Sequence, residues 1–429
     1  MPVLQRRLRF SDMVERLAPQ FRAIDRRMEE AIPLLREWVQ INSGSFNRAG
    51  LDEMGRRVSA LFREWTGVEA ARVETEPVEI LRDDGRIERV KLGDVLHLAW
   101  HPERKRRLLL IGHLDTVFAP DDPFQDVREL DEERWNGPGV ADMKGGILVM
   151  ALALAAFAES PFSDAVGWDV VLNGDEEIGS PASAPLLPDF ARRAQLGLVF
   201  EPALDARRMA GARKGSANIH YRITGRSAHA GRAFAQGRNA LVAAADLALR
   251  LDALNGKRAE VTVNPAVLHA GEALNRVPAT AVLRVNIRVP DADSQAWVDG
   301  QLAMIEQAVA AREGIAVTRL GGFHRPPKPA APPLQALFAL VREAGRSLGI
   351  ALEFVPTGGC CDGNNLWAAG LPNVDTLGVV GGGIHSDAEW IHLPSLATRA
   401  KLALLIIAGF ATGMIDLQGL GGDRRDSAI

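Results

Sequence analysis

The chain has 429 residues, a length that predicts two domains rather than one hydrophobic core. Hydrophobic residues make up 47% and charged residues 24%, as in globular proteins, and the net charge of −4 with scattered Lys and Arg gives no footprint for nucleic acid. The longest apolar stretches, 146–157 and 402–411, are too short to span a membrane, and no signal peptide is evident. The adjacent Cys360 and Cys361 are the only cysteines, which favours the reducing cytoplasm.

The first half of the chain alternates predicted strands with predicted helices. Apolar residues at helical spacing predict helices over 22–42, 49–65, 142–158 and 183–194. Alternating or continuous apolar runs predict strands over 71–80, 91–100, 107–115, 166–172 and 196–200. Residues 116–141, rich in Pro, Asp and Gly, predict a long and therefore functional loop. This order indicates a doubly wound, mostly parallel α/β sheet.

From about residue 212 the pattern becomes that of a small α+β sandwich. Its strands are predicted over 215–224, 260–269, 280–289 and 315–320, and its helices over 237–253 and 293–312. After a proline-dense hinge, the α/β rhythm resumes with helices 334–348, 362–369 and 394–412 and strands 352–355 and 373–379. We therefore expect a discontinuous catalytic domain of residues 1–211 and 324–429, interrupted by an inserted α+β domain of residues 212–323.

Five residues with metal-binding side chains stand at predicted strand ends or in nearby loops: His113, Asp142, Glu177, Glu201 and His385. In open α/β sheets the carboxyl ends of the strands meet at the edge where ligands bind. Each residue also has an ordinary interpretation: Asp142 could cap the next helix, the two glutamates could be solvated loop acids, and His385 could be a turn residue. One shared site explains all five, and two imidazoles with three carboxylates suit two zinc ions bridged by one carboxylate.

Two neighbouring acids could support this site. Asp115 follows His113 by two positions, so in extended chain both side chains lie on one side, and the carboxylate could hold the second imidazole nitrogen. Glu176 precedes Glu177, and adjacent side chains in extended chain face opposite ways. One could then bind metal while the other acts as general base on a metal-bound water. The alternatives are a turn aspartate and an ordinary acidic turn.

Six stretches carry a resemblance to a known family: Gly112-His-Leu-Asp-Thr-Val, Gly137-Pro-Gly-Val-Ala-Asp-Met-Lys-Gly-Gly, Asn173-Gly-Asp-Glu-Glu-Ile-Gly-Ser, Glu201-Pro, Gly225-Arg-Ser-Ala-His-Ala-Gly and Gly383-Ile-His-Ser. The chain resembles the dinuclear zinc amidohydrolases and peptidases that include carboxypeptidase G, aminoacylase, acetylornithine deacetylase and succinyl-diaminopimelate desuccinylase. The resemblance implies a zinc-exopeptidase-like catalytic domain and two Zn²⁺ ions per subunit, for which Co²⁺ or Mn²⁺ could substitute. It also implies that Asp142 bridges the two ions and that the other four candidates are terminal ligands.

The same resemblance implies further roles. Asp115 would orient His113, and Glu176 would be the general base. His229 of the inserted domain would reach the active site of the partner subunit and stabilise the oxyanion, which implies a homodimer and a dimerisation or lid role for the insert. From the residues alone, His229 could equally be a solvated turn residue.

The carboxypeptidase G branch is the most similar part of the family. The segment Gly271-Glu-Ala-Leu-Asn-Arg-Val-Pro resembles one that carries a substrate-contacting asparagine, which implies that role for Asn275. Arg325 matches the guanidinium that holds the substrate carboxylate, with Arg288 as a second candidate, although both could form ordinary surface ion pairs. The loop at Cys360 and Cys361 departs from the branch, so these residues either pack in a tight loop or reshape the specificity pocket.

We therefore expect a cytoplasmic metal-dependent hydrolase that cleaves an amide bond next to a free carboxylate. Its substrate would be a small N-acyl amino acid or a short peptide, and no nucleic-acid or membrane partner is expected. One alternative is a deacylase of a diamino acid or polyamine derivative. Another is a catalytically silent binding protein of the same fold, which the presence of every catalytic residue type argues against.

Overall fold

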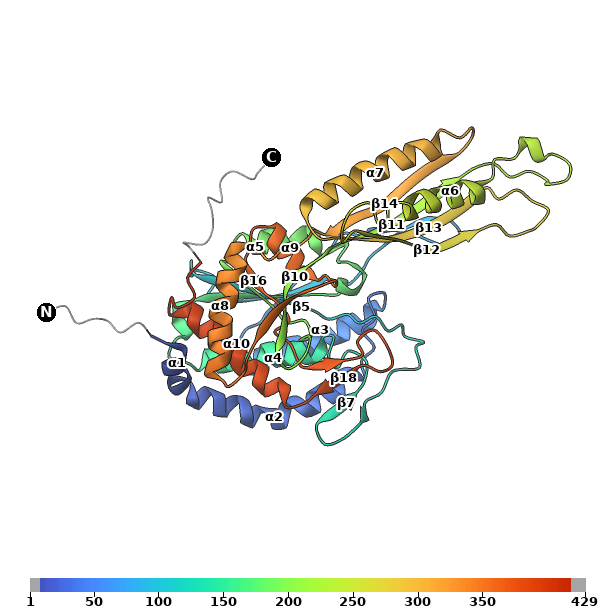
Figure 1. The fold of residues 1–429 in the computed structure, drawn as a ribbon. Helices are drawn as coiled ribbons and strands as arrows, with labels where there is room; N and C mark the ends of the chain where they lie inside the picture. Colours follow the sequence, from blue (N-terminus) through green and yellow to red (C-terminus); the bar gives the residue numbers. More distant parts are fainter. Residues whose placement is uncertain (1–7, 418–429) are drawn as a thin grey trace.

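The computed structural model describes residues 8–417, and its larger unit is built on a six-stranded sheet (Figure 1). The strand order is β1 (Ala70–Val73), β4 (Val95–Trp100), β8 (Gly167–Asn173), β5 (Arg107–His113), β9 (Leu196–Val199) and β16 (Asn373–Val374). β8, β5, β9 and β16 run parallel to one another, whereas β4 is antiparallel to β8 and β1 is antiparallel to β4. The predicted α/β fold class with a mostly parallel sheet is confirmed.

The central strands are continuous apolar runs because both faces of this sheet are covered. Every residue of β5 and β8 is buried. Leu108 and Leu110 of β5 belong to the core on one face, and Leu109 and Ile111 belong to the core on the other. The register pairs the last residue of β5, His113, with the last residue of β8, so both strands end at the same edge.

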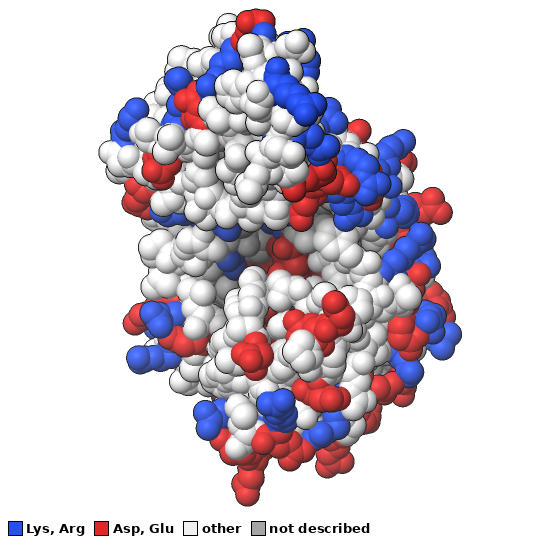
Figure 2. Space-filling view, turned by 90° about the vertical axis from the view of Figure 1, so that its right-hand side faces the viewer, with Lys and Arg blue, Asp and Glu red and all other residues white. Residues whose placement is uncertain are grey.

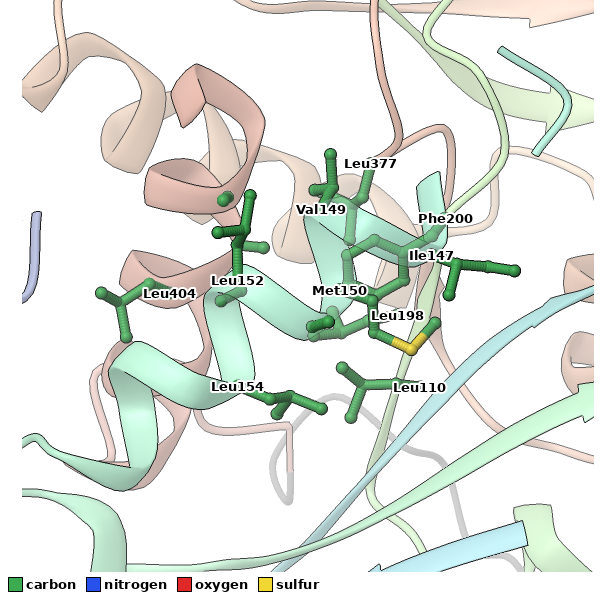
Figure 3. Packing of buried hydrophobic residues seen from close by; sticks show 14 of the residues in the cluster. Leu110, Ile147, Val149, Met150, Leu152, Leu154, Leu198, Phe200, Leu377 and Leu404 are labelled. Carbon is green, nitrogen blue, oxygen red and sulfur yellow. The ribbon is translucent and has the colours of Figure 1, made fainter. Parts of the chain in front are cut away.

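Helices on one face of the sheet enclose the largest apolar core (Figure 3). α4 (Lys144–Ala158) is apolar all round and lies buried between the sheet and α10 (Ser395–Ala411). The remaining helices of this layer are α1 (Phe10–Arg16), α2 (Ala18–Val39), α3 (Arg48–Thr66) and α8 (Pro332–Ser347). The opposite face carries α5 (Leu187–Ala191) and α9 (Asp362–Ala368).

The second unit is a four-stranded antiparallel sheet with helices on one face (Figure 1). Its strand order is β12 (Thr262–Ala270), β13 (Thr280–Val289), β11 (Gly215–Thr224) and β14 (Ala316–Arg325), and its helices are α6 (Ala240–Asp252) and α7 (Ala292–Ala310). Alternation along β11 sends Ile219 and Tyr221 into the core beneath the helices and leaves Asn218 and His220 on the other face. This unit, called the insert below, has the predicted α+β character, and its last strand continues to Arg325 instead of ending at residue 320.

The chain passes between the two units at Arg213 and again at Lys328, and these two crossings lie side by side. Each residue donates its backbone N–H to the carbonyl oxygen of the other, at 2.9 and 3.0 Å. Both side chains meet the buried carboxylate of Asp375, at 2.6 and 2.9 Å from Nε and Nη2 of Arg213 and 3.6 Å from Nζ of Lys328. β10 (Arg208–Arg213), which the sequence analysis missed, pairs in parallel with β15 (Glu353–Thr357) just before the first crossing.

The region predicted as two long strands over 71–80 and 91–100 is more divided than expected. β1 ends at Val73, and β2 (Val78–Leu81) leaves the main sheet to form a hairpin with β3 (Ile87–Val90). The second predicted strand begins only at Val95, as β4. The β2–β3 hairpin contacts β14, so it bridges the two units.

Two other predicted elements are shorter in the structure. The helix predicted over 183–194 consists of a 3-10 turn, η3 (Ala184–Leu186), followed by α5, because Pro185 and Pro188 lack the backbone N–H that a continuous helix needs. The strand predicted over 373–379 ends at Val374, because Thr376 has a positive φ of 58°.

Short strands connect the loop predicted over 116–141 with the segment around residue 385. They are β6 (Arg128–Glu129), β7 (Arg134–Asn136), β18 (Trp390–His392) and β17 (Gly381–Gly382), in that spatial order. The remaining 3-10 turns are η1 (Ser163–Ala165), η2 (Glu176–Ile178) and η4 (Phe234–Gln236). Within residues 8–417 we find no helix that combines the length and apolarity needed to cross a lipid bilayer.

Candidate metal centre

The five predicted ligands converge at the carboxyl edge of the main sheet. His113 ends β5, Glu177 lies in η2 directly after β8, and Glu201 follows β9. Asp142 lies just before α4, and His385 follows β17 with a positive φ of 62°. Their donor atoms form two groups that share Asp142, and the donors of each group lie within 4.8 Å of one another.

Asp142 stands between the two imidazoles. Its Oδ1 is 3.2 Å from Nε2 of His113, and its Oδ2 is 3.2 Å from Nε2 of His385. Oε1 of Glu201 lies 3.8 Å from Nε2 of His113, and Oε2 of Glu177 lies 3.2 Å from Nε2 of His385. The centre therefore has two lobes, each with its own imidazole and carboxylate, joined by the shared carboxylate of Asp142.

Asp115 contacts three residues of the centre: His113, Glu176 and Glu177. Nδ1 of His113 lies 3.0 Å from the carbonyl oxygen of Asp115 and 3.3 Å from its Oδ1. The Asp115 carboxylate also accepts the backbone N–H groups of Glu176 and Glu177, both at 3.1 Å, and the hydroxyl of Ser45 at 2.7 Å. A proton on Nδ1 of His113 is thereby directed to Asp115, which leaves the lone pair of Nε2 facing the lobe.

Glu389, which the sequence analysis did not single out, holds the loop that presents Asp142. Its buried carboxylate accepts backbone N–H groups from Gly139, Ala141 and Asp142, at 3.0, 2.9 and 3.0 Å. The contact with Asp142 spans 247 residues of sequence. No local sequence pattern could indicate this role of Glu389, because Glu389 is one of two acidic residues in the short turn that follows His385.

Burial dominates the electrostatics of the lobes. It raises the pKa of Glu177 to about 8, with the charge of Asp142 adding to the effect, and it raises the pKa of Glu201 well above the usual range. Burial acts in the same direction on Asp142, but hydrogen bonds from His113 and His385 outweigh it and lower the pKa of Asp142. Hydrogen bonds to Asp142 and Glu177 raise the pKa of His385 to about 11. Positive charge is therefore favoured between these carboxylates.

The donor set fits divalent metal ions of the zinc type. Imidazole nitrogen and carboxylate oxygen are ligands that Zn²⁺, Co²⁺ and Mn²⁺ accept. Counting the shared Asp142, each lobe offers one nitrogen and two carboxylates, which leaves coordination positions for water or substrate. Acidic side chains are visible inside the hollow between the two units, where such ions would be reached from solvent (Figure 2).

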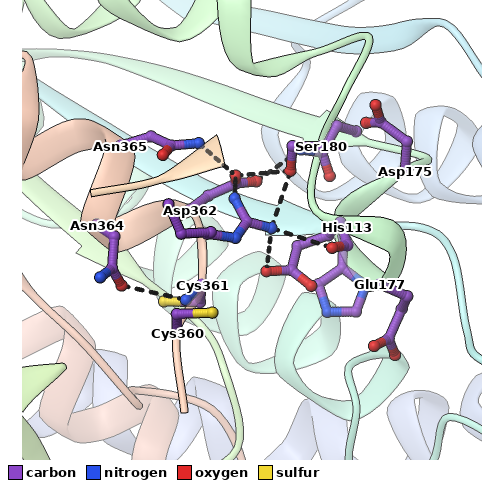
Figure 4. Close-up of polar contacts among 12 residues, drawn as sticks. His113, Asp175, Glu177, Ser180, Cys360, Cys361, Asp362, Asn364 and Asn365 are labelled. Carbon is purple, nitrogen blue, oxygen red and sulfur yellow. Dashed lines mark hydrogen bonds and ion pairs between the residues drawn. The ribbon is translucent and has the colours of Figure 1, made fainter. Parts of the chain in front are cut away.

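Glu176 lies beside the lobes and belongs to neither, and its carboxylate is bound by Arg325. The same arginine contacts Ser180 and Asp362, and Figure 4 shows these two residues hydrogen-bonded to each other. Nη2 of Arg325 donates to Oε1 of Glu176 at 2.6 Å and to Oγ of Ser180 at 3.0 Å, and Nη1 pairs with Asp362. Burial raises the pKa of Glu176 to about 7, against the opposing charge of Arg325. Arg325 was predicted to bind a substrate carboxylate. In the structure it is only 3% exposed, and its guanidinium is already bound to two protein carboxylates.

His229 and Asn275 lie together on two adjoining loops, and the structure does not bring them to the metal centre of their own chain. The N–H of Ala230 donates to the carbonyl oxygen of Asn275 at 2.9 Å, and His229 forms an isolated bridge with Arg276. Both loops, 225–239 and 271–279, lie at the end of the insert that points away from the main sheet (Figure 1).

Arg288 and the two cysteines lie where the insert meets α9. Nη1 of Arg288 is 2.9 Å from Sγ of Cys360, and its Nε donates to Oδ1 of Asn286 at 3.0 Å. Cys361 is buried, with its Sγ 3.2 Å from Oδ2 of Asp375. The packing of Cys361 agrees with the tight-loop interpretation, whereas Cys360 touches the residue predicted as the second substrate arginine.

Two imidazoles and three carboxylates beside a separate glutamate, at the strand ends of an α/β sheet, define a metal-dependent hydrolase. Comparisons with known proteins agree. Residues 109–408 match the model of peptidase family M20/M25/M40. The chain is 31% identical to carboxypeptidase G2 of Pseudomonas sp. (strain RS-16) over 314 residues, which are 72% of this chain and 75% of the relative.

Solved structures share the fold. The M20 family metallo-carboxypeptidase Sso-CP2 of Sulfolobus solfataricus superposes with a TM-score of 0.68 at 17% identity, covering 89% of this chain and 99% of that chain. Human carnosine dipeptidase 1 superposes with a TM-score of 0.68 at 16% identity, covering 92% of this chain and 100% of that chain. The chain therefore belongs to peptidase family M20/M25/M40 and is a metal-dependent hydrolase of peptide or other amide bonds. The resemblance seen in the sequence is confirmed.

Proposed function

We propose that this enzyme hydrolyses an amide bond next to a free carboxylate, as a carboxypeptidase or an N-acyl amino acid amidohydrolase. The observation that carries the proposal is the Asp142 carboxylate divided between His113 and His385, with Glu176 beside both lobes. The 31% identity to carboxypeptidase G2 supports the carboxypeptidase form of the proposal.

In this proposal each lobe holds one Zn²⁺ ion, with Co²⁺ or Mn²⁺ as substitutes. His113 and Glu201 would hold one ion, His385 and Glu177 would hold the other, and Asp142 would be shared by both. The close approach of these donors supports the assignment. When bound, the ions polarise the scissile carbonyl and lower the pKa of a water molecule.

Glu176 takes a proton from the attacking water and delivers it to the departing amine. Its place next to Glu177, with a carboxylate outside both lobes, supports this role. Asp115 orients His113 and accepts the backbone N–H groups of both glutamates, so one carboxylate positions a metal ligand and the base together.

The substrate carboxylate is proposed to bind Arg288 or Arg325, both on strands of the insert. For Arg325 this requires an exchange, in which the incoming carboxylate replaces Glu176 at Nη2 and frees Glu176 to act as the base. Arg288 requires no such exchange, since its partners are the Cys360 thiol and the Asn286 amide.

We further propose a homodimer formed through the insert, in which His229 and Asn275 act at the active site of the partner subunit. Exposed apolar side chains support an interface on the insert: Leu241, Val242 and Leu249 on α6 and Leu268 on the edge strand β12. In this arrangement His229 stabilises the negative charge that develops on the scissile carbonyl oxygen, and Asn275 contacts the substrate.

Two further proposals concern organisation and location. The boundaries of the insert at 212 and 323 are supported by the neighbouring chain crossings at Arg213 and Lys328. The free thiols of Cys360 and Cys361 support a reducing cytoplasmic location.

Metal content measured together with hydrolysis tests the proposal. Elemental analysis should find about two zinc ions per chain, and a panel of N-acyl amino acids and dipeptides should be hydrolysed until a chelator is added and again after zinc is restored. Activity that persists after complete metal removal would refute the mechanism. Equal turnover of substrates whose terminal carboxylate is replaced by a carboxamide would refute the required carboxylate.

A further inference from the structure

A cavity of about 840 Å³ lies beside the metal centre, open to solvent and lined by residues of both units. Four parts of the chain line it: Phe46, the stretch 78–83 of the β2–β3 hairpin, the segment from Glu177 to Pro181, and the face of the insert sheet opposite its helices. Glu177 belongs both to this wall and to the metal centre, so the space continues from the proposed reaction site. We call it the hairpin cavity; it belongs to the hollow between the units seen in Figure 2.

Seven of the sixteen residues that line the cavity have apolar side chains: Phe46, Val78, Ile80, Leu81, Ile178, Pro181 and Leu320. Phe46 is 59% exposed, so this large aromatic side chain offers much of its surface to a bound group. Apolar walls with a few polar positions are typical of sites that bind organic ligands. The cavity therefore suits a ligand with an apolar body.

The charged residues of the wall disfavour an anionic ligand. Arg284 pairs with Asp83 at 2.6 Å and donates to the carbonyl oxygen of Leu81 at 3.1 Å. Arg82 pairs with Glu88 at 2.7 Å, and Glu79 adds a negative charge. Because the two arginines already have carboxylate partners, the cavity fits an uncharged group better than a second carboxylate.

Polar positions are concentrated on the insert sheet, at Asn218, His220 and His324. Burial lowers the pKa of both His220 and His324, which favours the neutral form of both rings. The imidazole of His324 and the amide of Asn218 can hydrogen-bond a carbonyl, an amide or a ring nitrogen of a ligand.

We propose that the hairpin cavity binds the acyl side of the substrate and selects a bulky, uncharged, mainly apolar acyl group that carries a hydrogen-bonding atom. This inference rests on the proposed function. Arg288 and Arg325, the proposed partners of the substrate carboxylate, are not among the residues that line the cavity, which favours the acyl side of the substrate over its carboxylate end as the occupant. An acetyl group would leave most of this volume to water.

A series of N-acyl derivatives of one amino acid tests the proposal, with acetyl, hexanoyl, benzoyl and 2-naphthoyl groups. We expect kcat/KM to rise at least ~30-fold from acetyl to 2-naphthoyl, because each larger group buries more apolar surface. A 4-carboxybenzoyl derivative should be hydrolysed at least ~10-fold less efficiently than the benzoyl one. A flat series, or a preference for the charged acyl group, would overturn the proposal.

A pair of matched variants locates the selectivity. Leu320→Trp fills the cavity from β14 and should reduce the advantage of 2-naphthoyl over acetyl to within ~3-fold. Met304→Trp adds the same side chain at a 56% exposed position of α7, on the helical side of the insert. This variant should keep the full rise in kcat/KM from acetyl to 2-naphthoyl. An unchanged series in the Leu320→Trp variant would place the acyl group elsewhere and overturn the inference.

Binding measurements separate this inference from the proposed function. Calorimetric titration of the Glu176→Gln variant with the same compounds should show affinity rising with acyl size, and Leu320→Trp should abolish that rise. This result would support the acyl subsite even if none of the compounds is hydrolysed. The absence of hydrolysis would refute the proposed function but not the acyl subsite. Equal affinities across the series would overturn the acyl subsite, whatever the turnover.

Discussion

Replacement of Asp375 by asparagine should lower the free energy of unfolding by about 3–5 kcal/mol, the usual cost of removing one partner of a buried ion pair. Asp375 is 0% exposed, and the side chains of Arg213 and Lys328 are 8% and 1% exposed. The carboxylate accepts two hydrogen bonds from Arg213, at 2.6 and 2.9 Å. Asparagine keeps the shape but leaves both cations buried without their shared carboxylate, at the point where the chain crosses between the units.

Urea unfolding followed by circular dichroism measures this effect. Asp189→Asn is the matched control, because Asp189 also pairs with an arginine, Arg192, but both side chains are exposed, 62% and 66%. The control should change stability far less, since exposed pairs contribute little. Similar small losses in both variants would refute the reasoning that Asp375 anchors two buried cations.

Four further predictions follow from the site and the core. Glu176→Gln should lower kcat by roughly 10²–10⁴-fold with zinc content unchanged, measured by steady-state kinetics and elemental analysis; metal loss in this variant would contradict its place outside the ligand set. Asp115→Asn should weaken zinc binding by roughly 10–100-fold in competition with a chelator, because an amide N–H₂ cannot accept the backbone N–H groups that the carboxylate accepts. Burial acts to raise the pKa of Asp169, but hydrogen bonds from His97 and Arg107 outweigh burial and lower this pKa. The ionised Asp169 carboxylate therefore stabilises the fold fully above about pH 4, and this stabilisation is lost as the pH falls. The stability difference between wild type and Asp169→Asn, measured in urea, should shrink from pH 7 to pH 3. His229→Ala and Glu176→Gln subunits, each nearly inactive alone, should regain activity when co-expressed, because a mixed dimer contains one intact site; no recovery would argue against action across the interface.

The sequence was sufficient for features that depend on local pattern. The buried strands β5 and β8 are continuous apolar runs, and His113, Glu177 and Glu201 could be placed together because parallel strands end at one edge. Their individual roles stay predictions, although their convergence in the structure agrees with them.

Contacts between distant segments were not predictable in this way. The partners of Arg325 lie 149 residues before it, at Glu176, and 37 residues after it, at Asp362. The sequence therefore showed a cationic side chain but not that its guanidinium is bound to two protein carboxylates. Glu389 was missed because its role consists of backbone hydrogen bonds to a loop near residue 140. The β2–β3 hairpin was not predicted: β2 was included in a strand over 71–80 and β3 lay outside the predicted strands, because alternation indicates a strand without indicating where it breaks or which sheet receives it.

The split of the larger unit has a consequence for the order in which the protein can fold during synthesis. The insert sheet is formed by one continuous stretch, from β11 to β14, and can be complete once these residues have left the ribosome. By contrast, α4 is made early but is covered by α10, and β9 gains its outer neighbour β16 only near residue 374. A nascent chain that has just completed β14 therefore carries a finished insert beside an apolar helix that still lacks α10, which is the stage at which chaperones would protect it from aggregation.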